Sequence, residues 1–492
     1  MSLYVGIDLG TSSVKLLLTD AQGNIINTVT REYPLYFPQP GWSEQRPEDW
    51  CEGTLSGLEE LLTGYDPAEV AGIGTAGQMH GLVVLDEEDR VIRPAILWND
   101  GRTEEETAYL NEVIGRSVLS QRTANIAFAG FTAPTILWLR KNEPENFGKI
   151  KKIMLPKDYI NYVLTGVHAC DYSDASGMLL LDVAHKCWSR EMLEVCGIRE
   201  EQMPTLFESY EVIGTVRPEI AKRLGFRNDV KVAAGAGDNA AAAVGTGVVG
   251  NGGCNISLGT SGTIFVTLDH FAVDPNNALH AFAHADGGYH LMGCMLSAAS
   301  CNQWLCKTVL HTDSYSEEQA RIQPEALGNN HVFFLPYLMG ERSPINDVNA
   351  RGTLIGMTMD TKREDLVQAV LEGVAFAIRD SFEVAKSLGI EIPSSRLCGG
   401  GAQSPLWRKI FANILGIPLE TVKTEQGPGY GGAILAMVAC GEYASVKEAA
   451  EALTEVSEVT MPDPELTRRY DEQYRKFRKI YPALKEIFPE IR

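Results

Sequence analysis

The sequence has 492 residues, 45% of them hydrophobic and 22% charged, so it is long enough for two or more domains with separate cores. Its formal net charge of −21 disfavours contact with phosphate backbones and anionic lipid, which argues against nucleic-acid and membrane partners. The ten cysteines without a CxxC pair, and the lack of an export signal or an apolar run of roughly 20 residues, indicate a cytoplasmic protein with reduced thiols.

The first segment with a chemical signal is a predicted hairpin over residues 4–20, whose turn has the sequence DLGTSS. Gly10 lets the backbone approach a phosphate closely, and Thr11 and Ser12 offer hydroxyl donors. Lys15 adds positive charge to the same loop. Asp8, at the end of the first strand, is placed to hold a magnesium ion through water. The alternative is a tight hairpin that merely has an Asp in its turn.

Further strands are predicted in the first half of the sequence, and helices in the second half. Apolar runs at residues 70–75, 82–85 and 95–98 predict three strands. Helical patterns in the second half cover residues 363–388, 406–415 and 464–481. Strands mixed with helices in both halves indicate an α/β protein.

Asp238 is the only charged residue in the small-residue stretch of residues 233–245. A lone carboxylate among residues that pack a core poorly is costly unless it is paired or functional. We therefore interpret Asp238 as a general base. The alternative is a cap of the Ala-rich helix that follows, and one residue can fill both roles.

A second predicted hairpin, over residues 255–267, repeats the pattern of the first, with Gly259 and Thr260 in its turn. Two such hairpins suggest an internal duplication, because a nucleotide clamped between two halves needs a phosphate loop from each. The Gly-rich stretch of residues 244–253 is suited to a hinge. We therefore expect one domain over residues 1–246 and a second over 247–492.

Two further Gly-rich segments follow in the second half. Three glycines in residues 397–402 come between a predicted strand and a helix and would allow contact with a flat ring or a ribose. A plain strand-to-helix turn is the alternative there. Residues 427–436 are typical of a helix start that packs closely against another helix, which is a structural role.

Taken together, the motifs DLGTSS, LGTSG, GGGA and GDNAA resemble those of the FGGY family of carbohydrate kinases, in order and over essentially the whole chain. That family belongs to the actin-like ATPase superfamily. The resemblance implies two actin-like ATPase (ribonuclease H-like) α/β domains with a catalytic cleft between them. Residues 131–138 follow a family signature except at Thr135, where the pattern usually has Lys, and we interpret this as local variation.

The resemblance also implies roles for individual residues. Asp238 matches the base that takes the proton of the sugar hydroxyl, and Asp8 matches the carboxylate at the magnesium and phosphate position. The residues that match the ATP site are Gly10, Thr11, Ser12 and Lys15 in the first loop, Gly259 and Thr260 in the second, and Gln303, Gly400, Gly401 and Ala402 on the adenosine side. The residues expected to bind the sugar are Met79, His80, Trp98 and Asn239. On Met79 and His80 alone, core filler and a satisfied loop histidine would be the better interpretation.

Within the family, residues 76–81, 96–102, 155–159, 335–337 and 340–342 resemble the members that phosphorylate xylulose. The implied reaction is ATP- and Mg²⁺-dependent phosphorylation of D-xylulose to D-xylulose 5-phosphate by a xylulokinase-like enzyme. Whether the protein forms a homodimer is left open. L-ribulose, gluconate and glycerol are alternative substrates. A non-catalytic actin-like ATPase is a less favoured alternative, and a sugar-sensing regulator would need a basic helix-turn-helix, which is not seen.

Overall fold

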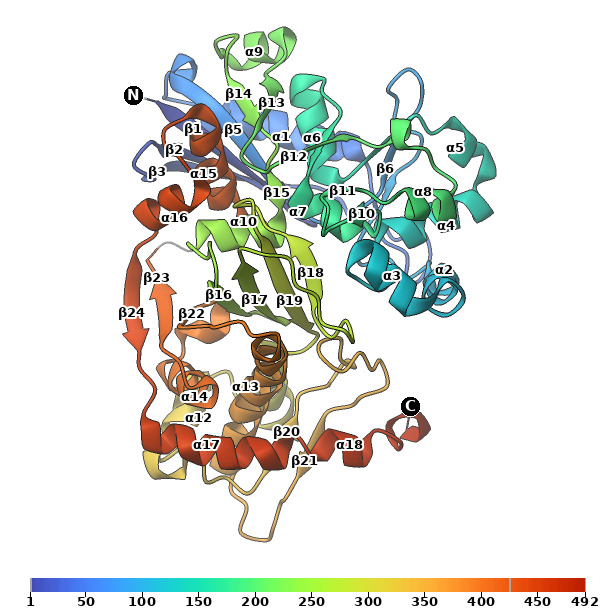
Figure 1. Ribbon diagram of the computed structural model, residues 1–492. Helices are drawn as coiled ribbons and strands as arrows, with labels where there is room; N and C mark the ends of the chain where they lie inside the picture. The colour runs from blue at the N-terminus through green and yellow to red at the C-terminus, as the bar shows by residue number, and fades with distance from the viewer. Residues whose placement is uncertain (1, 424–425, 492) are drawn as a thin grey trace.

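The computed structural model describes residues 2–423 and 426–491. Within those residues, every helix is too short or too polar to cross a lipid bilayer. Two seven-stranded sheets form the framework (Figure 1). The first sheet has the order β13-β14-β5-β1-β2-β3, with β15 also pairing with β5. Its strands are β1 (Leu3–Leu9), β2 (Ser13–Asp20), β3 (Ile25–Glu32), β5 (Val70–Gly77), β13 (Val212–Thr215), β14 (Lys231–Ala233) and β15 (Ala236–Gly237).

The second sheet has the order β18-β19-β17-β16-β22-β23-β24. Its strands are β16 (Cys254–Leu258), β17 (Gly262–Leu268), β18 (His280–Ala283), β19 (Tyr289–Met295), β22 (Ser395–Cys398), β23 (Leu419–Val422) and β24 (Val456–Thr460). The pairings β16–β17–β19 are antiparallel, β16–β22–β23 are parallel, and β24 is antiparallel to β23. The first sheet repeats this scheme with β1–β2–β3, β1–β5–β14 and β13. The shared strand order agrees with the expected duplication.

The first sheet is covered on both faces, which explains the continuous apolar run in β2. Successive side chains of a strand point to opposite faces. Leu16 packs against helix α1 (Pro47–Leu61), and Leu17 packs against helix α15 (Pro428–Cys440). Helix α15 comes from the second half of the sequence but lies on the first sheet (Figure 1).

Helix α15 can approach this sheet closely because glycines face each other across the contact. A Cβ added at Gly6 would lie 1.9 Å from the carbonyl oxygen of Gly429, and one at Gly74 would lie 2.0 Å from that of Gly432. On its other side, α15 packs against α10 (Asp238–Gly245), where a Cβ at Gly431 would lie 1.8 Å from the Ala241 oxygen. The close helix packing predicted for residues 427–436 is confirmed.

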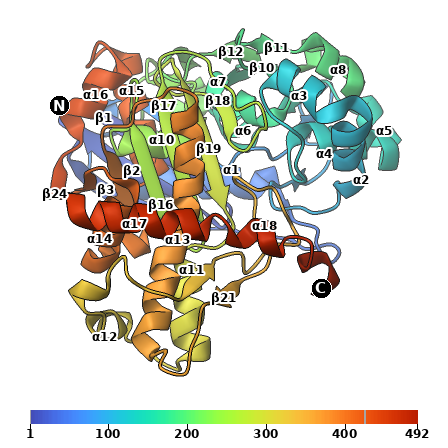
Figure 2. The ribbon, with the colours of Figure 1, turned by 60° about the horizontal axis from the view of Figure 1, so that its bottom comes forward.

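The second sheet is packed mainly against α13 (Arg363–Ser387), a 25-residue helix buried over most of its length. Helix α14 (Pro405–Leu415) packs beside α13, and α17 (Pro464–Phe477) crosses it (Figure 2). The ring of Phe376 contacts those of Tyr470, Tyr474 and Phe477. The three predicted helices are confirmed, except that the last one breaks before α18 (Ile480–Leu484).

A helical insertion between β5 and β13 completes the first half. The three strands expected there are β5, β6 (Val83–Leu85) and β7 (Ala95–Ile96). β7 is shorter than expected because its partner β4 (Glu44–Gln45) has only two residues. The other elements of the insertion include α2 (Glu104–Ala108), α3 (Arg116–Thr123), α4 (Thr132–Asn142), α5 (Pro144–Lys149), β8 (Lys152–Met154), α6 (Pro156–Thr165), β9 (Ala169–Asp171), α7 (Tyr172–Ala175) and α8 (Arg190–Cys196). Helix α9 (Pro218–Leu224) follows between β13 and β14.

Candidate active site

The two candidate catalytic carboxylates lie at the carboxyl ends of two strands of the first sheet that both pair with β5. β1 and β5 are parallel, with Asp8 opposite Ala76, and the short strand β15 pairs with the end of β5. Asp238 follows β15 directly and is the first residue of α10. In α/β sheets, the crevice at the carboxyl ends of parallel strands is where ligands bind. Strand pairing thus brings together Asp8 and Asp238, which are 230 positions apart in the sequence.

Burial and like charge dominate the electrostatics of these carboxylates. Burial, and then the negative charge of Asp238, raise the pKa of Asp8 to about 7, and Lys15 opposes this. Burial also raises the pKa of Asp238 to about 6, against two hydrogen bonds from Asn239. The backbone N and the Nδ2 of Asn239 donate to Asp238 Oδ1 at 2.7 and 2.9 Å. Two partly buried carboxylates that repel each other fit a divalent cation, which would relieve that repulsion.

The first turn is held in place by amide and indole side chains of β4 and of the segments that follow β5 and β7. Gln45 Nε2 donates to the Thr11 carbonyl at 2.6 Å, and Trp98 Nε1 donates to Thr11 Oγ1 at 3.0 Å. The Thr11 hydroxyl in turn donates to Gln78 Oε1 at 3.3 Å. These bonds fix the turn beside Asp8. Sequence reasoning missed Gln45 and gave Gln78 no role beyond its place in residues 76–81, because nothing local in either segment points to Thr11.

The other residues of the first loop have distinct positions. The Gly10 backbone N donates to the Ser13 carbonyl at 3.0 Å and closes the turn, and the Ser12 side chain is exposed. Lys15 lies opposite Asp8 in the β1–β2 register, and its Nζ donates to Gln426 Oε1 at 2.7 Å. The Lys15 amine is therefore directed to the loop before α15.

A hydrogen bond fixes the imidazole ring of His80 in a single tautomer. Its Nδ1 lies 2.6 Å from the Gly177 carbonyl, which can only accept, so Nδ1 carries the hydrogen and Nε2 is an acceptor. Burial lowers its pKa to about 4, so the ring is neutral at neutral pH. The ring stacks on Phe131 at 4.2 Å, and the backbone φ of +70° is uncommon for a residue other than Gly. A neutral histidine with one acceptor nitrogen is suited to a sugar hydroxyl.

The remaining candidate sugar-binding residues adjoin Asp238 or the first turn. Met79 is buried, and its Sδ lies 3.9 Å from Asn239 Nδ2. Met79 also belongs to a small apolar cluster with Phe265 and Met292, as the core-filler interpretation expects. Trp98 is 45% exposed, so its ring face is open to a ligand. Thr135 is buried in α4 with its hydroxyl bonded to the Phe131 carbonyl.

A separate pocket of about 580 Å³ lies in the second half, next to the turn between β16 and β17. Four predicted residues line it: Thr260, Gln303, Gly400 and Gly401. Its other lining residues are Ala299, Ser300, Asn302, Asp313, Ser314, Tyr315, Ser316, Gln319, Gln403, Ser404, Pro405 and Trp407. The volume is in the range of ligand pockets and suits a nucleoside.

Two predicted nucleotide residues, Gly259 and Ala402, do not line this pocket. Ala402 is buried, and its backbone N donates to the Gly399 carbonyl at 3.0 Å. The Gly259 carbonyl accepts from the Ala299 backbone N at 2.9 Å and so anchors the start of α11 (Ala299–Gln303). The first turn does not line the pocket either, so the predicted residues form two groups, one on each half. Another pocket, of about 460 Å³, lies between α13 and α17 and has none of the predicted residues in its lining.

Comparison with known proteins gives consistent results. Residues 3–245 match the N-terminal domain of the FGGY family of carbohydrate kinases, and residues 254–440 match its C-terminal domain. Xylulose kinase of Escherichia coli (strain K12) is 42% identical over 448 residues, which cover 91% of this chain and 92% of that protein.

Solved structures extend this likeness to the three-dimensional fold. A "xyloylose kinase" from Brucella ovis superimposes with a TM-score of 0.93 at 40% identity, over 99% of this chain and 100% of that one. Gluconate kinase from Lactobacillus acidophilus gives a TM-score of 0.94 at 26% identity, over 100% of each chain. The similarity includes both halves and the segments that carry Asp8 and Asp238.

Proposed function

The chain belongs to the FGGY family of carbohydrate kinases, and on this premise we propose that it transfers the γ-phosphoryl group of ATP to D-xylulose. The product is D-xylulose 5-phosphate, formed at the terminal 5-hydroxyl. The observation that carries the proposal is that strand pairing brings Asp8 and Asp238 together at one end of the first sheet. Asn239 bonds to Asp238 and contacts Met79, the residue before His80. The 42% identity to a xylulose kinase over most of both chains supports the choice of sugar.

In the proposed mechanism, Asp238 is the general base. One of its carboxylate oxygens takes the proton of the 5-hydroxyl, whose oxygen forms a bond to the γ-phosphorus while the bond to the departing ADP oxygen breaks. The two hydrogen bonds from Asn239 fix the carboxylate. The His80 Nε2 accepts a sugar hydroxyl, Asn239 Nδ2 donates to another, and Met79 and Trp98 pack on the carbon chain.

The nucleotide is proposed to lie between the halves. Gly10, Thr11, Ser12 and Lys15 contact its phosphates from the first half, with Gly259 and Thr260 from the second. Gln303, Gly400 and Gly401 contact adenosine, with Ala402 supporting them from beneath. Asp8 would hold a magnesium ion through water. That ion, when bound, neutralises charge on the phosphates.

Three broader statements accompany this assignment. We propose that the sequence divides into two domains, residues 1–246 and 247–492. Helix α15 belongs to the second by sequence but packs on the sheet of the first. We propose a cytoplasmic location, since all ten cysteines are free thiols. A homodimer is the proposed assembly, and light scattering of the purified protein tests it.

A substrate comparison tests the assignment. We expect kcat/KM to be highest for D-xylulose among D-xylulose, L-ribulose, gluconate and glycerol. Gluconate is the second candidate because of the likeness to a gluconate kinase structure. His80→Ala should lower kcat/KM for D-xylulose by about 10- to 100-fold, because a site built to bond a hydroxyl is left with an unpaired group. The control is His270→Ala, since His270 is exposed and pairs with Asp269. A clear preference for another substrate, or no effect of His80→Ala, would contradict the sugar assignment.

A further inference from the structure

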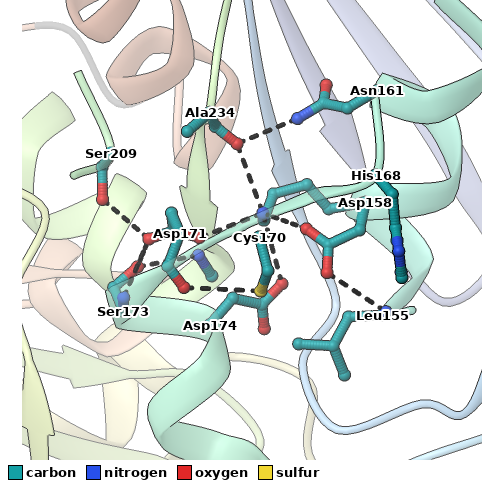
Figure 3. A network of polar contacts seen from close by, with 12 residues as sticks. Leu155, Asp158, Asn161, His168, Cys170, Asp171, Ser173, Asp174, Ser209 and Ala234 are labelled. Atoms are coloured by element: carbon teal, nitrogen blue, oxygen red, sulfur yellow. Dashed lines mark hydrogen bonds and ion pairs between the residues drawn. The ribbon is translucent and has the colours of Figure 1, made fainter. Parts of the chain in front are cut away.

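A fully buried cluster of charged side chains lies under the candidate base, centred on Lys157 near the start of α6. The Lys157 Nζ donates to Asp158 Oδ1 at 2.6 Å and to the Ala234 carbonyl at 3.3 Å, and forms an ion pair with Asp171 Oδ1 at 3.0 Å. All four charged side chains of the cluster, with Asp174 as the fourth, are solvent-inaccessible. The cluster joins α6, β9, α7 and the segment between β14 and β15 (Figure 3).

Burying such a cluster costs more free energy than filling the same volume with apolar side chains. Taking charges out of water costs several kcal/mol per ion, and apolar residues of similar volume often give equal or greater stability. The position of the cluster is therefore informative. A Cβ added at Gly77 would lie 2.9 Å from the Cβ of Lys157. Lys157 thus packs directly under the strand end that leads into Met79 and His80.

A chain of hydrogen bonds connects the cluster to Asp238. Asp171 Oδ2 accepts from the backbone N and the Oγ of Ser173, at 2.9 and 2.5 Å. Because the single hydroxyl hydrogen of Ser173 is used on Asp171, its oxygen lone pairs remain free to accept. One of them accepts the backbone N–H of Gly237 at 3.2 Å. Gly237 is the residue immediately before Asp238, so this bond fixes the peptide that carries the base.

Ser209 provides a natural comparison with Ser173. Its Oγ donates to the same oxygen, Asp171 Oδ2, at 2.7 Å, and both serines are 1% exposed (Figure 3). Only Ser173 accepts from Gly237. The two hydroxyls therefore contribute similarly to the cluster, but one of them alone reaches the backbone of the base.

Asp174 is the carboxylate of the cluster that is held most weakly. Neither of its carboxylate oxygens has a hydrogen-bond partner among the described residues, and its Oδ2 lies 3.8 Å from Lys157 Nζ. Burial raises the pKa of Asp174 well above its ordinary value, and Lys157 offsets this only in part. The negative charge of Asp238 contributes to this shift as well, so Asp174 and Asp238 are electrostatically linked.

We propose that Ser173, oriented by the Lys157–Asp171 ion pair, is a positioning residue for the general base: it holds the Gly237 peptide so that Asp238 meets the sugar hydroxyl. This inference rests on the proposed kinase function. A displaced base slows the chemical step without weakening the binding of either substrate. Misplacement by about 1 Å is enough to cost on the order of 100-fold in rate.

The test compares Ser173→Ala with Ser209→Ala in the full-length enzyme. We expect Ser173→Ala to lower the single-turnover rate of phosphoryl transfer by about 10- to 100-fold, with unchanged dissociation constants for sugar and ATP. Ser209→Ala should stay within about twofold of the parent rate. Ser209→Ala should lower the melting temperature because it loses one hydrogen bond to Asp171. Ser173→Ala should lower it further, because it also loses the bond from the Gly237 N–H.

Two results would overturn the inference: equal transfer rates in the two variants, or a loss in Ser173→Ala that appears only as weaker sugar or ATP binding. Failure of the proposed function looks different, because the parent enzyme would then phosphorylate none of the sugars tested. If the parent prefers a sugar other than D-xylulose, the comparison of the two serines is made with that sugar.

Discussion

Replacing Asp238 by Asn should make the protein less active and, above about pH 4, more stable. Asn keeps the size of the side chain and an oxygen that can accept from both nitrogens of Asn239. It removes the base and the buried negative charge. A general base contributes typically about 10²–10⁴-fold in rate, so turnover should fall by that factor while nucleotide affinity is retained.

The stability gain follows from the raised pKa of Asp238. Burial raises that pKa from 3.8 to about 6 in the folded protein, so stability is highest at low pH and falls as pH rises through this window. The ionised carboxylate therefore costs about 3 kcal/mol at pH 8 and about 1.6 kcal/mol at pH 5. Asn is neutral at both pH values and removes the cost. The variant should also lower the pKa of Asp8, which the charge of Asp238 raises.

Thermal unfolding at the two pH values measures this directly. One kcal/mol shifts the melting temperature by about 2 °C for a unit of roughly 250 residues, so we expect a gain of about 6 °C at pH 8 and about 3 °C at pH 5. Equal gains at the two pH values would refute the argument from a buried ionised carboxylate. Turnover close to that of the parent would refute the assignment of Asp238 as the base.

Four further predictions concern the metal, the nucleotide pocket, closure and helix packing. Asp8→Ala should keep the fold but lose most activity, and unchanged magnesium-dependent turnover would leave Asp8 as a turn residue only. Gly401→Ala should raise KM for ATP with KM for sugar unchanged, because its Cβ would lie 2.8 Å from Leu258 and 3.0 Å from Trp407, and an unaffected KM for ATP would count against this pocket. Solution scattering should give a smaller radius of gyration with sugar and nucleotide bound, and an unchanged radius at saturation would argue against closure. Gly431→Ala should destabilise the protein, because the added methyl group would clash with the Ala241 carbonyl. The control Gly148→Ala, in α5 with open space around it, should be neutral or stabilising, and equal melting temperatures of the two variants would contradict this packing.

The framework of the fold could be predicted because its signals are local. Each hairpin is encoded by two β-rich runs and a small-residue turn, and β1–β2 and β16–β17 pair as those runs indicate. The glycines of α15 likewise predict a close helix contact. The location of that helix on the first sheet could not be predicted, since the residues that accept it, Gly6 and Gly74, belong to strands far away in the sequence.

The candidate site shows the same limit. Asp8 and Asp238 stand out in the sequence because each is a charge in an unusual local setting. Lys157 and Asp171 have ordinary local surroundings, and only the tertiary structure brings their side chains to 3.0 Å from each other. The nucleotide pocket divides in the same way: its glycines were predicted, whereas Tyr315 and Trp407 are added to it by folding.

The placement of Asp238 explains how a base can stay aligned with the sugar while the two halves move. Its N-terminal side is fixed to the first sheet by β15 and by the Ser173–Gly237 hydrogen bond, and its neighbour Asn239 contacts Met79 of the same half. The C-terminal end of α10 leads into the Gly-rich residues 247–253, where the chain passes to the second sheet. In the proposed closure, rotation about this segment carries the nucleotide pocket toward the base. The sugar and the base then keep their relative geometry, and only the phosphoryl donor has to travel.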